Sequence, residues 1–272
     1  MFKRQWNLSN DLQTFDLGQS GARQGAWRER EALYFDQQLA EPVLLKDDLG
    51  LKAFRLEAEI AFPELYGFAG LVFGARDFRN FELVYISPAS DTWSGETQYD
   101  PIMNGSSTWQ IYHGAAYQSP VPVPLGEWVK LTLDVQPDNV AIHVGTEGSP
   151  QLAIRKLQLG NPVGRIGVWG HLASYIGNLA VREIPASPVD HAPSNMPQLA
   201  QDTFVTEWMV SEPYTAQTGP GASQKWTKVF VEENGTLNIN RLHAADVQGT
   251  AIQAVDRGAR GYRTTHEPAA WL

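Results

Sequence analysis

The sequence contains no cysteine. This absence excludes disulfide scaffolds, cysteine-ligated zinc, iron–sulfur clusters and thiol nucleophiles. Basic residues are also scarce, because 21 Lys and Arg stand against 30 Asp and Glu, which gives a formal net charge of −9. Binding along a phosphate backbone needs a basic face, so we expect no nucleic-acid partner.

Long apolar runs are missing as well, and none approaches the roughly 18 residues of a membrane-spanning helix. The first 15 residues, MFKRQWNLSNDLQTF, carry two cations but no apolar core of a signal peptide. We therefore expect no membrane association and a cytoplasmic protein as the sequence is written. A secreted protein whose leader has been removed is the alternative.

Several catalytic and ligand-binding motifs are absent too. There is no Walker loop and no G-x-S-x-G nucleophile elbow. The six histidines are scattered without the spacing of a zinc site, and His171, which follows Trp169 and Gly170, is either a rim contact or a loop filler. We expect no cofactor. Calcium stays open, because Asp91, Asp100 and Asn104 could converge with backbone carbonyls.

What the sequence does contain is alternation with a period of two, which is typical of half-buried strands. In residues 54–62 (FRLEAEIAF) apolar residues alternate with Arg55, Glu57 and Glu59. Residues 128–135 and 140–144 repeat the pattern on either side of a Gln-Pro-Asp-Asn turn, which predicts an antiparallel hairpin. Further strands are predicted at 31–36, 67–74, 80–87, 107–113, 150–154, 163–169 and 175–184.

Many short strands separated by Gly and Pro predict an all-β fold, a two-sheet antiparallel jelly-roll β-sandwich, over residues 1–185. Residues 186–200 are rich in proline and indicate a linker. Residues 201–272 are expected to form a small, incomplete β module with a mobile tail of about a dozen residues. Its predicted strands are 204–210, 226–233 and 236–240, the last two joined by an Asn234-Gly235 hairpin turn. We expect residues 200–255 to pack on the sandwich or on another chain, as in a homo-oligomer.

The order of features between residues 50 and 184 resembles a known superfamily. GFAGLVFGARDFRNFELVYISP is followed by the loop ASDTWSGETQYDPIMNG, by a strand pair, and by GRIGVWGHLASYIGNLAVREI. This order is similar to the concanavalin A-like lectin/glucanase superfamily, in its laminin-G-like or keto-disaccharide-hydrolase-like branches. The resemblance implies a jelly roll with glycan sites on the concave face or on rim loops. The E-x-D-x-x-E run of the family-sixteen glucanases is absent, and Glu57, Glu59 and Glu64 instead favour a solvent-facing strand surface.

Aromatic and hydroxyl-pairing residues are dense between residues 85 and 113. A sugar site needs a flat aromatic platform with polar side chains beside it. The candidate ligand-binding residues are Tyr85, Trp93, Gln98, Tyr99, Asp100, Asn104, Trp109, Gln110 and Tyr112. The competing interpretation is that Tyr85 and Trp109 are core aromatics and that Asp100 and Asn104 form ordinary turns.

Three functions follow from these patterns. The first is carbohydrate binding, with a saccharide as the partner. The second is hydrolysis of a (3-keto-)glycoside or polysaccharide, for which Glu82, Glu96 and Asp100 are the candidate carboxylates and His113 a candidate proton carrier. The third is a structural or interaction module without affinity for sugars.

Overall fold

The chain forms two compact units, residues 1–189 and residues 190–272. The computed structural model describes residues 2–38, 41–90, 94–145, 148–187, 205–215, 225–243, 250–256 and 263–266. The predicted linker, residues 186–200, lies outside these residues apart from Ala186 and Ser187. Within the described ranges, no helix has the length and apolar character needed to cross a membrane.

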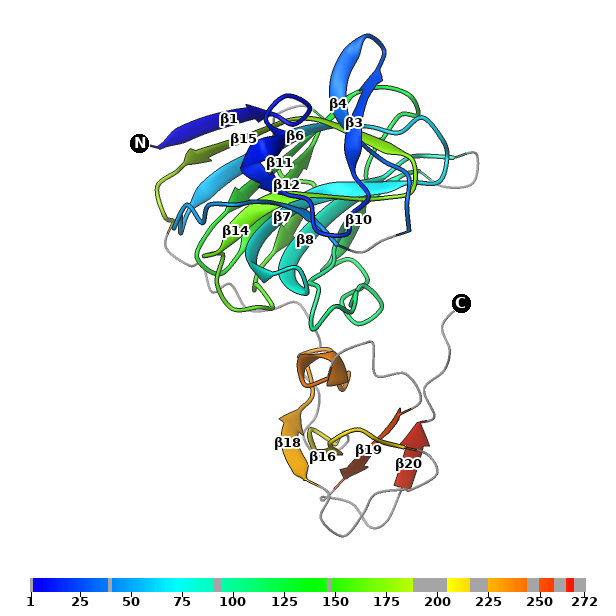
Figure 1. Ribbon diagram of the computed structural model, residues 1–272. Coiled ribbons are helices and arrows are strands. Elements are labelled where there is room, and N and C mark those ends of the chain that lie inside the picture. The colour runs from blue at the N-terminus through cyan, green and yellow to red at the C-terminus, as the bar shows by residue number, and fades with distance from the viewer. Residues whose placement is uncertain are drawn as a thin grey trace. The chain divides into compact units, whose positions relative to one another are not determined.

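The first unit is built from two antiparallel sheets (Figure 1). In spatial order, the eight-stranded sheet consists of β13 (Leu152–Ile154), β12 (Val140–Val144), β11 (Val129–Val135), β6 (Phe54–Ala61), β15 (Ser174–Glu183), β4 (Arg30–Phe35) and β3 (Arg23–Trp27), with β1 (Lys3–Asn7) also on β15. The seven-stranded sheet consists of β10 (Gln118–Pro120), β9 (Glu96–Tyr99), β8 (Asn80–Ser87), β7 (Phe68–Asp77), β14 (Arg165–His171), β5 (Val43–Leu45) and β2 (Phe15–Asp16). A 3-10 turn, η1 (Leu12–Thr14), precedes β2. The predicted two-sheet antiparallel sandwich is confirmed.

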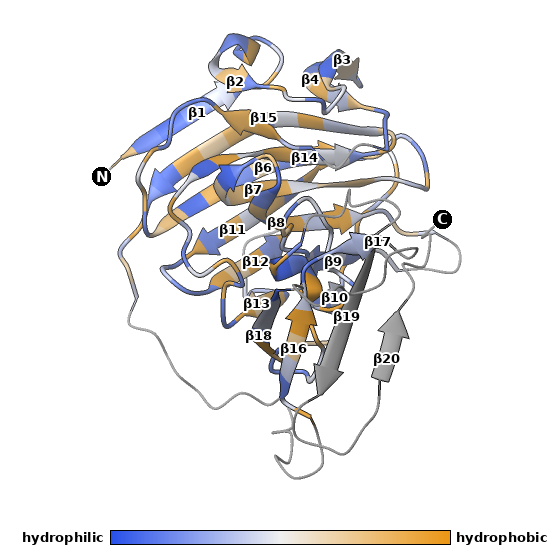
Figure 2. Ribbon diagram, turned by 60° about the horizontal axis from the view of Figure 1, so that its bottom comes forward, coloured by the Kyte–Doolittle hydropathy of each residue, from blue (hydrophilic) through white to orange (hydrophobic). Residues whose placement is uncertain are grey.

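The alternating patterns explain which face of each strand meets the other sheet. In β6, Phe54, Leu56, Ala58 and Ile60 are buried, whereas the intervening charged residues are partly exposed. Arg55 forms two hydrogen bonds of 2.6 Å to Asp134 of the neighbouring β11 on that outer face. Figure 2 shows hydrophilic and hydrophobic residues alternating along strands of this unit. The period of two therefore positions the apolar side chains between the layers.

The inner side of the seven-stranded sheet is marked by a close approach between the layers. A Cβ added at Gly170 in β14 would lie 2.4 Å from a ring carbon of Phe35 in β4, so the two strands belong to facing sheets. Gly170 pairs with Ala69, which shares its face with Leu71 and Phe73 of β7. The opposite face of this sheet, which carries Val72, Tyr85 and Trp169, therefore points away from the eight-stranded sheet.

Two strand predictions are wrong. Residues 107–113 form turns, not a strand, because the buried Asp100 carboxylate binds the chain at Ser107 and Thr108. Residues 236–240 do not form a strand either, and a 3-10 turn, η2 (Ile239–Arg241), begins there. Gly235 has the positive φ of 83° expected in the predicted turn, but the chain is not paired as a hairpin beyond it.

In the described residues of the second unit, the strands form a five-stranded antiparallel sheet. Its strands are β17 (Tyr214–Thr215), β19 (Thr250–Asp256), β16 (Glu207–Ser211) and β18 (Trp226–Phe230) in spatial order, with β20 (Arg263–His266) also on β19. Strand β20 lies within the tail that the sequence predicts to be mobile, and the rest of that tail lies outside the described residues.

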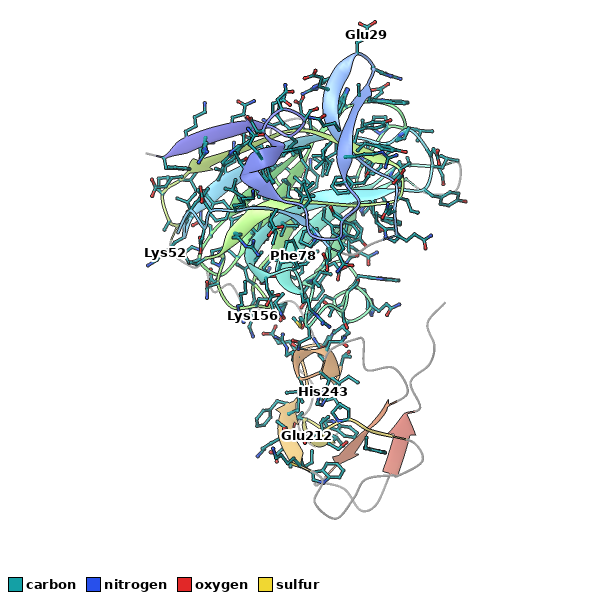
Figure 3. All side chains as sticks on the ribbon, in the orientation of Figure 1. Glu29, Lys52, Phe78, Lys156, Glu212 and His243 are labelled. Atoms are coloured by element: carbon teal, nitrogen blue, oxygen red, sulfur yellow. The ribbon has the colours of Figure 1, made fainter. Side chains whose placement is uncertain are left out.

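The hairpin that joins β3 to β4 turns at two residues that rarely adopt its conformation. Arg28 and Glu29 have φ values of 49° and 61°, and Glu29 lies at the tip (Figure 3). Two-residue turns of this kind favour Asn-Gly, because other side chains in the left-handed region cost about 1 kcal/mol or more each.

We expect the double variant Arg28→Asn, Glu29→Gly to raise the free energy of unfolding by about 1–2 kcal/mol, because it relieves this backbone strain. Urea denaturation of the full chain measures the change. The control Arg28→Ala keeps the strained backbone and should give no comparable gain. An equal gain in the control would show that loss of the arginine side chain, not relief of strain, is responsible.

Candidate functional site

The outer face of the seven-stranded sheet carries two neighbouring rows of aromatic and polar side chains. In the first row, Gln98 of β9 pairs with Tyr85 of β8, Tyr85 pairs with Gly70 of β7, and Gly70 pairs with Trp169 of β14. Paired residues in adjacent strands point to the same face of a sheet. Tyr85 and Trp169 therefore flank a glycine that carries no side chain.

The second row lies two residues further along each strand. Glu96 of β9 pairs with Ser87 of β8, and Phe68 of β7 pairs with His171 of β14. Phe68 precedes Ala69, which pairs with Ile86, so Phe68 and Ser87 share the outer face. This row provides a carboxylate at one end and an imidazole at the other.

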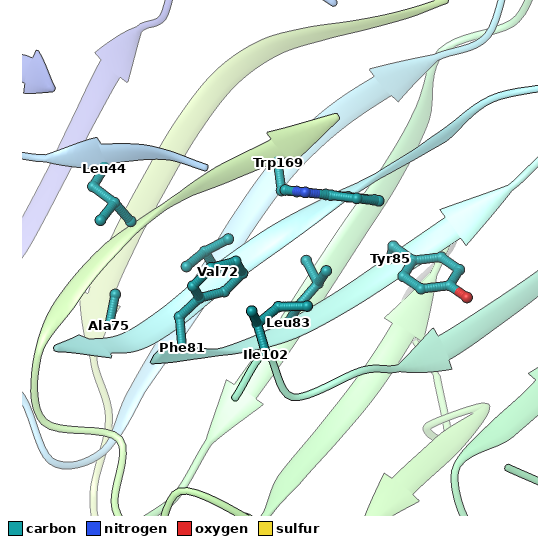
Figure 4. Packing of buried hydrophobic residues seen from close by; sticks show 8 residues of the cluster. All are labelled: Leu44, Val72, Ala75, Phe81, Leu83, Tyr85, Ile102 and Trp169. Carbon is teal, nitrogen blue, oxygen red and sulfur yellow. The ribbon is translucent and has the colours of Figure 1, made fainter. Parts of the chain in front are cut away.

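The four rings of the two rows form one cluster, called the ring cluster below: Phe68, Tyr85, Trp169 and His171. The rings of Tyr85 and Trp169 lie on neighbouring parts of this face (Figure 4), and their centroids are 5.9 Å apart. Phe68 meets Tyr85 edge-on at 5.6 Å, and His171 stacks on Trp169 at 5.9 Å with 11° between the ring planes. These separations are typical of favourable aromatic pairs.

Glycine is required at the centre of the cluster. An added Cβ at Gly70 would lie 2.0 Å from the carbonyl oxygen of Val84 and 2.6 Å from the Cα of Tyr85. Both atoms belong to the backbone of β8 and cannot rotate away. The close approach of β7 and β8 here therefore depends on the missing side chain.

Exposure differs among the rings. Tyr85 and Trp169 are each only 7% exposed, whereas Phe68 and His171 are partly exposed. Just before Phe68, the loop from β6 to β7 carries Leu65, 46% exposed, and Tyr66, 77% exposed. Tyr85 and Trp169 thus form the floor of the cluster, and the accessible ring surface lies at its Phe68 end.

Burial also sets the protonation of the face. It lowers the pKa of His171 and raises the pKa of Glu96, because both charged forms lose solvent. The pKa of the Tyr85 hydroxyl is raised, first by burial and then by the nearby Asp100 and Glu96 carboxylates. At neutral pH the face therefore presents a neutral imidazole and a neutral phenol.

Asp100 continues the outer face beyond Gln98, but its carboxylate is occupied by the following loop. It is 3% exposed and accepts hydrogen bonds from the Ser107 hydroxyl at 2.6 Å and from the Thr108 amide at 2.7 Å. The Trp109 amide also donates to it, and the Trp109 side chain is 46% exposed. Asp100 therefore forms the turn, as the competing interpretation of the sequence has it, and that turn carries the exposed Trp109.

Burial raises the pKa of Asp100 to about 6 from its ordinary value of 3.8, outweighing the hydrogen bonds that favour its charged form. Between these values the folded protein keeps a proton that the unfolded chain has lost. We expect the Asp100 contribution to stability to be complete below about pH 4 and to fall by about 3 kcal/mol as the pH rises to 6.

Denaturation of the parent and of Asp100→Asn from pH 3.5 to 7 measures this contribution as the difference between the two curves. The substituted amide does not titrate, so the difference should change with pH in the stated direction. A difference that stays constant across this range would contradict the shift.

Glu82 lies on the inner side of the sheet, opposite Phe73 of β7, and is 0% exposed. Its carboxylate accepts hydrogen bonds from the Tyr99 hydroxyl at 2.5 Å and from the Leu159 amide at 2.8 Å. The Tyr99 oxygen in turn accepts from the Gln158 amide at 2.8 Å. This network connects β8 and β9 to the segment that precedes β14, so Glu82 holds these parts of the fold together.

The predicted carboxylates are therefore not gathered at one place. Glu82 points between the sheets, whereas Glu96 and Asp100 point outward from β9 and the residue after it. Glu96 and Asp100 are four residues apart along an extended chain, so their Cα atoms are about 13 Å apart. Glycosidic hydrolysis needs carboxyl groups about 5–9.5 Å apart, so this arrangement gives no support to these carboxylates as a catalytic pair.

The predicted ligand-binding residues are divided in the same way. Tyr99 is 0% and Tyr112 1% exposed, and they pack against each other and Tyr117, so the expectation that they form an accessible platform is wrong. The side-chain amide of Gln98 donates to the Tyr99 and Tyr112 carbonyls. Asn104 forms a turn with a φ of 51°. Gln110 and His113 are exposed on the loop, and Trp93 lies outside the described residues.

Sequence reasoning did not propose Phe68 or Trp169 as candidate site residues and left His171 undecided. Their signal is the strand register, because Trp169 and His171 are two residues apart on β14 and pair with Gly70 and Phe68. A single sequence does not give this register.

The part of the chain that the structure describes contains no group of three or more His, Asp or Glu side chains that could hold a metal ion. The calcium candidate Asp91 lies outside the described residues.

Solved structures similar to this chain include three sugar-related proteins. The carbohydrate-binding module CBM66 of Bacillus subtilis gives a TM-score of 0.49 at 12% identity, over 62% of this chain and 96% of that one. A Caenorhabditis elegans galectin gives a TM-score of 0.38 at 11% identity, over 58% of this chain and 100% of the galectin chain. Domain 4 of the GH43 extracellular arabinanase AbnA of Geobacillus stearothermophilus, solved in complex with arabinotriose, gives a TM-score of 0.41 at 14% identity. The match covers 68% of this chain and 93% of that domain. No family model matches the chain, and no curated protein does. The sandwich architecture rests on the strand pairings described above.

Proposed function

We propose that the chain binds carbohydrate through the outer face of the seven-stranded sheet. The observation that carries this proposal is the ring cluster, with the Glu96 carboxylate in the same row as Phe68 and His171. A sugar ring has an apolar C–H face surrounded by hydroxyls, so it is recognised by aromatic surface combined with hydrogen-bonding groups.

Each group has a distinct part in this proposal. The partly exposed Phe68 ring contacts the apolar face of the sugar. The Glu96 carboxylate accepts hydrogen bonds from hydroxyls, and the neutral His171 imidazole both donates and accepts. Tyr85 and Trp169 support Phe68 and His171 from below, and the exposed Tyr66 and Trp109 supply further ring surface on neighbouring loops.

An array of neutral and acidic oligosaccharides, probed with the full chain, tests the proposal. Calorimetry with the best ligand then compares the parent with Phe68→Ala and Glu96→Gln. Loss of the ring contact or of a charge-assisted hydrogen bond should weaken binding about tenfold or more, which corresponds to about 1.4 kcal/mol.

Phe230→Ala and Glu29→Gln are matched controls, because both replace exposed residues elsewhere in the chain. The controls should bind like the parent. An array without any ligand, or a ligand whose affinity is unchanged by Phe68→Ala and Glu96→Gln, would overturn the proposal.

A further inference from the structure

A second group of aromatic side chains lies on the outer face of the other, eight-stranded sheet. Tyr34 of β4 pairs with Tyr175 of β15, and their ring centroids are 4.6 Å apart. Trp27 of β3 stacks on the same tyrosine, 5.4 Å from Tyr175 with 25° between the planes. We call Trp27, Tyr34 and Tyr175 the hairpin face.

The hairpin face points away from the core. Leu33 and Phe35, on either side of Tyr34, are 0% exposed, whereas Tyr34 itself is partly exposed. Trp27 and Tyr175 are partly exposed as well. Gly25 makes room beneath the rings, since a Cβ there would lie 2.9 Å from Tyr34 and 3.3 Å from Tyr175. The three rings are thus held in fixed positions on the outer side of the sheet.

The rings are bordered by two ion pairs. The Arg23 guanidinium lies 4.7 Å from the Tyr34 ring centroid and 2.5 Å from the Asp36 carboxylate. The Arg30 guanidinium lies 4.7 Å from the centroid of Trp128 and forms an ion pair with Glu59. Each pair places N–H donors and carboxylate acceptors beside aromatic surface while contributing no net charge.

We propose that the hairpin face is a second saccharide-binding surface, specific for neutral sugars. Ring surface with donors and acceptors beside it suits a polyhydroxylated ring. An anionic polymer is disfavoured because both guanidiniums already have a carboxylate partner. A second copy of the chain would bury these ion pairs, and desolvating them is costly.

The hairpin face contains none of the residues of the ring cluster. The proposal of a second binding surface therefore does not depend on the first proposal. The two surfaces belong to opposite outer faces of one sandwich. A chain with both would bind two saccharide segments at once and would link neighbouring strands of a polysaccharide.

The indole N–H signals of Trp27 and Trp169 report on the two faces separately in nuclear magnetic resonance spectra of the full chain. The probes are cellohexaose, xylohexaose, arabinohexaose, laminarihexaose and galactohexaose, and the signals are assigned with Trp27→Phe and Trp169→Phe. With at least one probe, the Trp27 signal should shift to saturation. In Tyr34→Ala, the sugar concentration at the midpoint of the Trp27 titration should rise at least fivefold. The midpoint of the Trp169 titration should not change.

Asp36→Asn keeps all three rings, replaces a carboxylate acceptor by an amide and removes the ion pair with Arg23. Because that pair is largely exposed, thermal unfolding should change little, whereas the sugar concentration at the midpoint of the Trp27 titration should rise. In Phe68→Ala the Trp27 response should persist. The proposal is overturned if no probe shifts the Trp27 signal, or if Phe68→Ala abolishes its response. A Trp27 signal that changes with protein concentration instead of with sugar would assign this face to self-association and would also overturn it.

Discussion

The variant Gly70→Ala is expected to destabilise the first unit by about 3 kcal/mol or more. The added methyl group would overlap the Val84 carbonyl oxygen at 2.0 Å and the Tyr85 Cα at 2.6 Å. Overpacking against side chains is relieved by rotation, but here the obstacle is the backbone of a central strand. Strands β7 and β8 would have to separate, which weakens their hydrogen bonds and moves Tyr85 away from Trp169.

Gly148→Ala is the matched control. Gly148 has no atom within 4 Å of an added Cβ, so this change should leave the free energy of unfolding within about 0.5 kcal/mol of the parent. Urea denaturation followed by tryptophan fluorescence compares the two variants. Similar stabilities for both would show that the strand contact at Gly70 adapts without cost.

The second large effect is expected for Glu82→Ala, which should lower the free energy of unfolding by about 3–5 kcal/mol. The carboxylate accepts hydrogen bonds from the Tyr99 hydroxyl and the Leu159 amide between the sheets, and its removal takes this acceptor away from both donors. Thermal and chemical denaturation measure the loss.

Two milder variants separate the hydrogen bonds from the cavity. Glu82→Gln keeps the volume and an acceptor for the Leu159 amide, so its cost should be smaller than that of Glu82→Ala. Tyr99→Phe removes the donor to Glu82 and the acceptor of the Gln158 amide and should cost about 1–3 kcal/mol. If Glu82→Gln instead destabilises as strongly as alanine, the negative charge itself is what the network needs.

Much of the fold could be predicted from the sequence because burial on one side leaves a period of two. The predicted strand 80–87 coincides with β8, and 175–184 differs from β15 (Ser174–Glu183) by one residue at each end. Strand β3 was not predicted, because RQGAW lies at a sheet edge and has no alternation. Residues 107–113 look like a strand, yet Ser107 and Thr108 donate hydrogen bonds to the Asp100 carboxylate, which folds the segment into turns. The alternation within residues 107–113 does not reveal this contact, because its acceptor lies seven to eight residues earlier in the chain.

The site was harder to predict than the fold. Aromatic density directs attention to Tyr85, which lies in the ring cluster, but equally to Tyr99, which faces the opposite side of the sheet. Alternation within one strand separates the two faces without telling which of them meets the other layer. Trp169 and Phe68 come from strands distant in sequence, and only the register across β7, β8 and β14 brings them together.

The outermost strands of the sandwich bear on how the protein behaves at high concentration. Among the described strands, five end the two sheets, and three of these are only two or three residues long: β2, β10 and β13. The other two are β1, which begins with Lys3 and Arg4, and β3, which begins with Arg23 and Gln24. The unpaired N–H and C=O groups of an edge strand form a template for pairing with strands of other chains. Short or charged edge strands make such pairing unfavourable. These edge strands are therefore expected to resist growth into fibrils, without any disulfide to hold them closed.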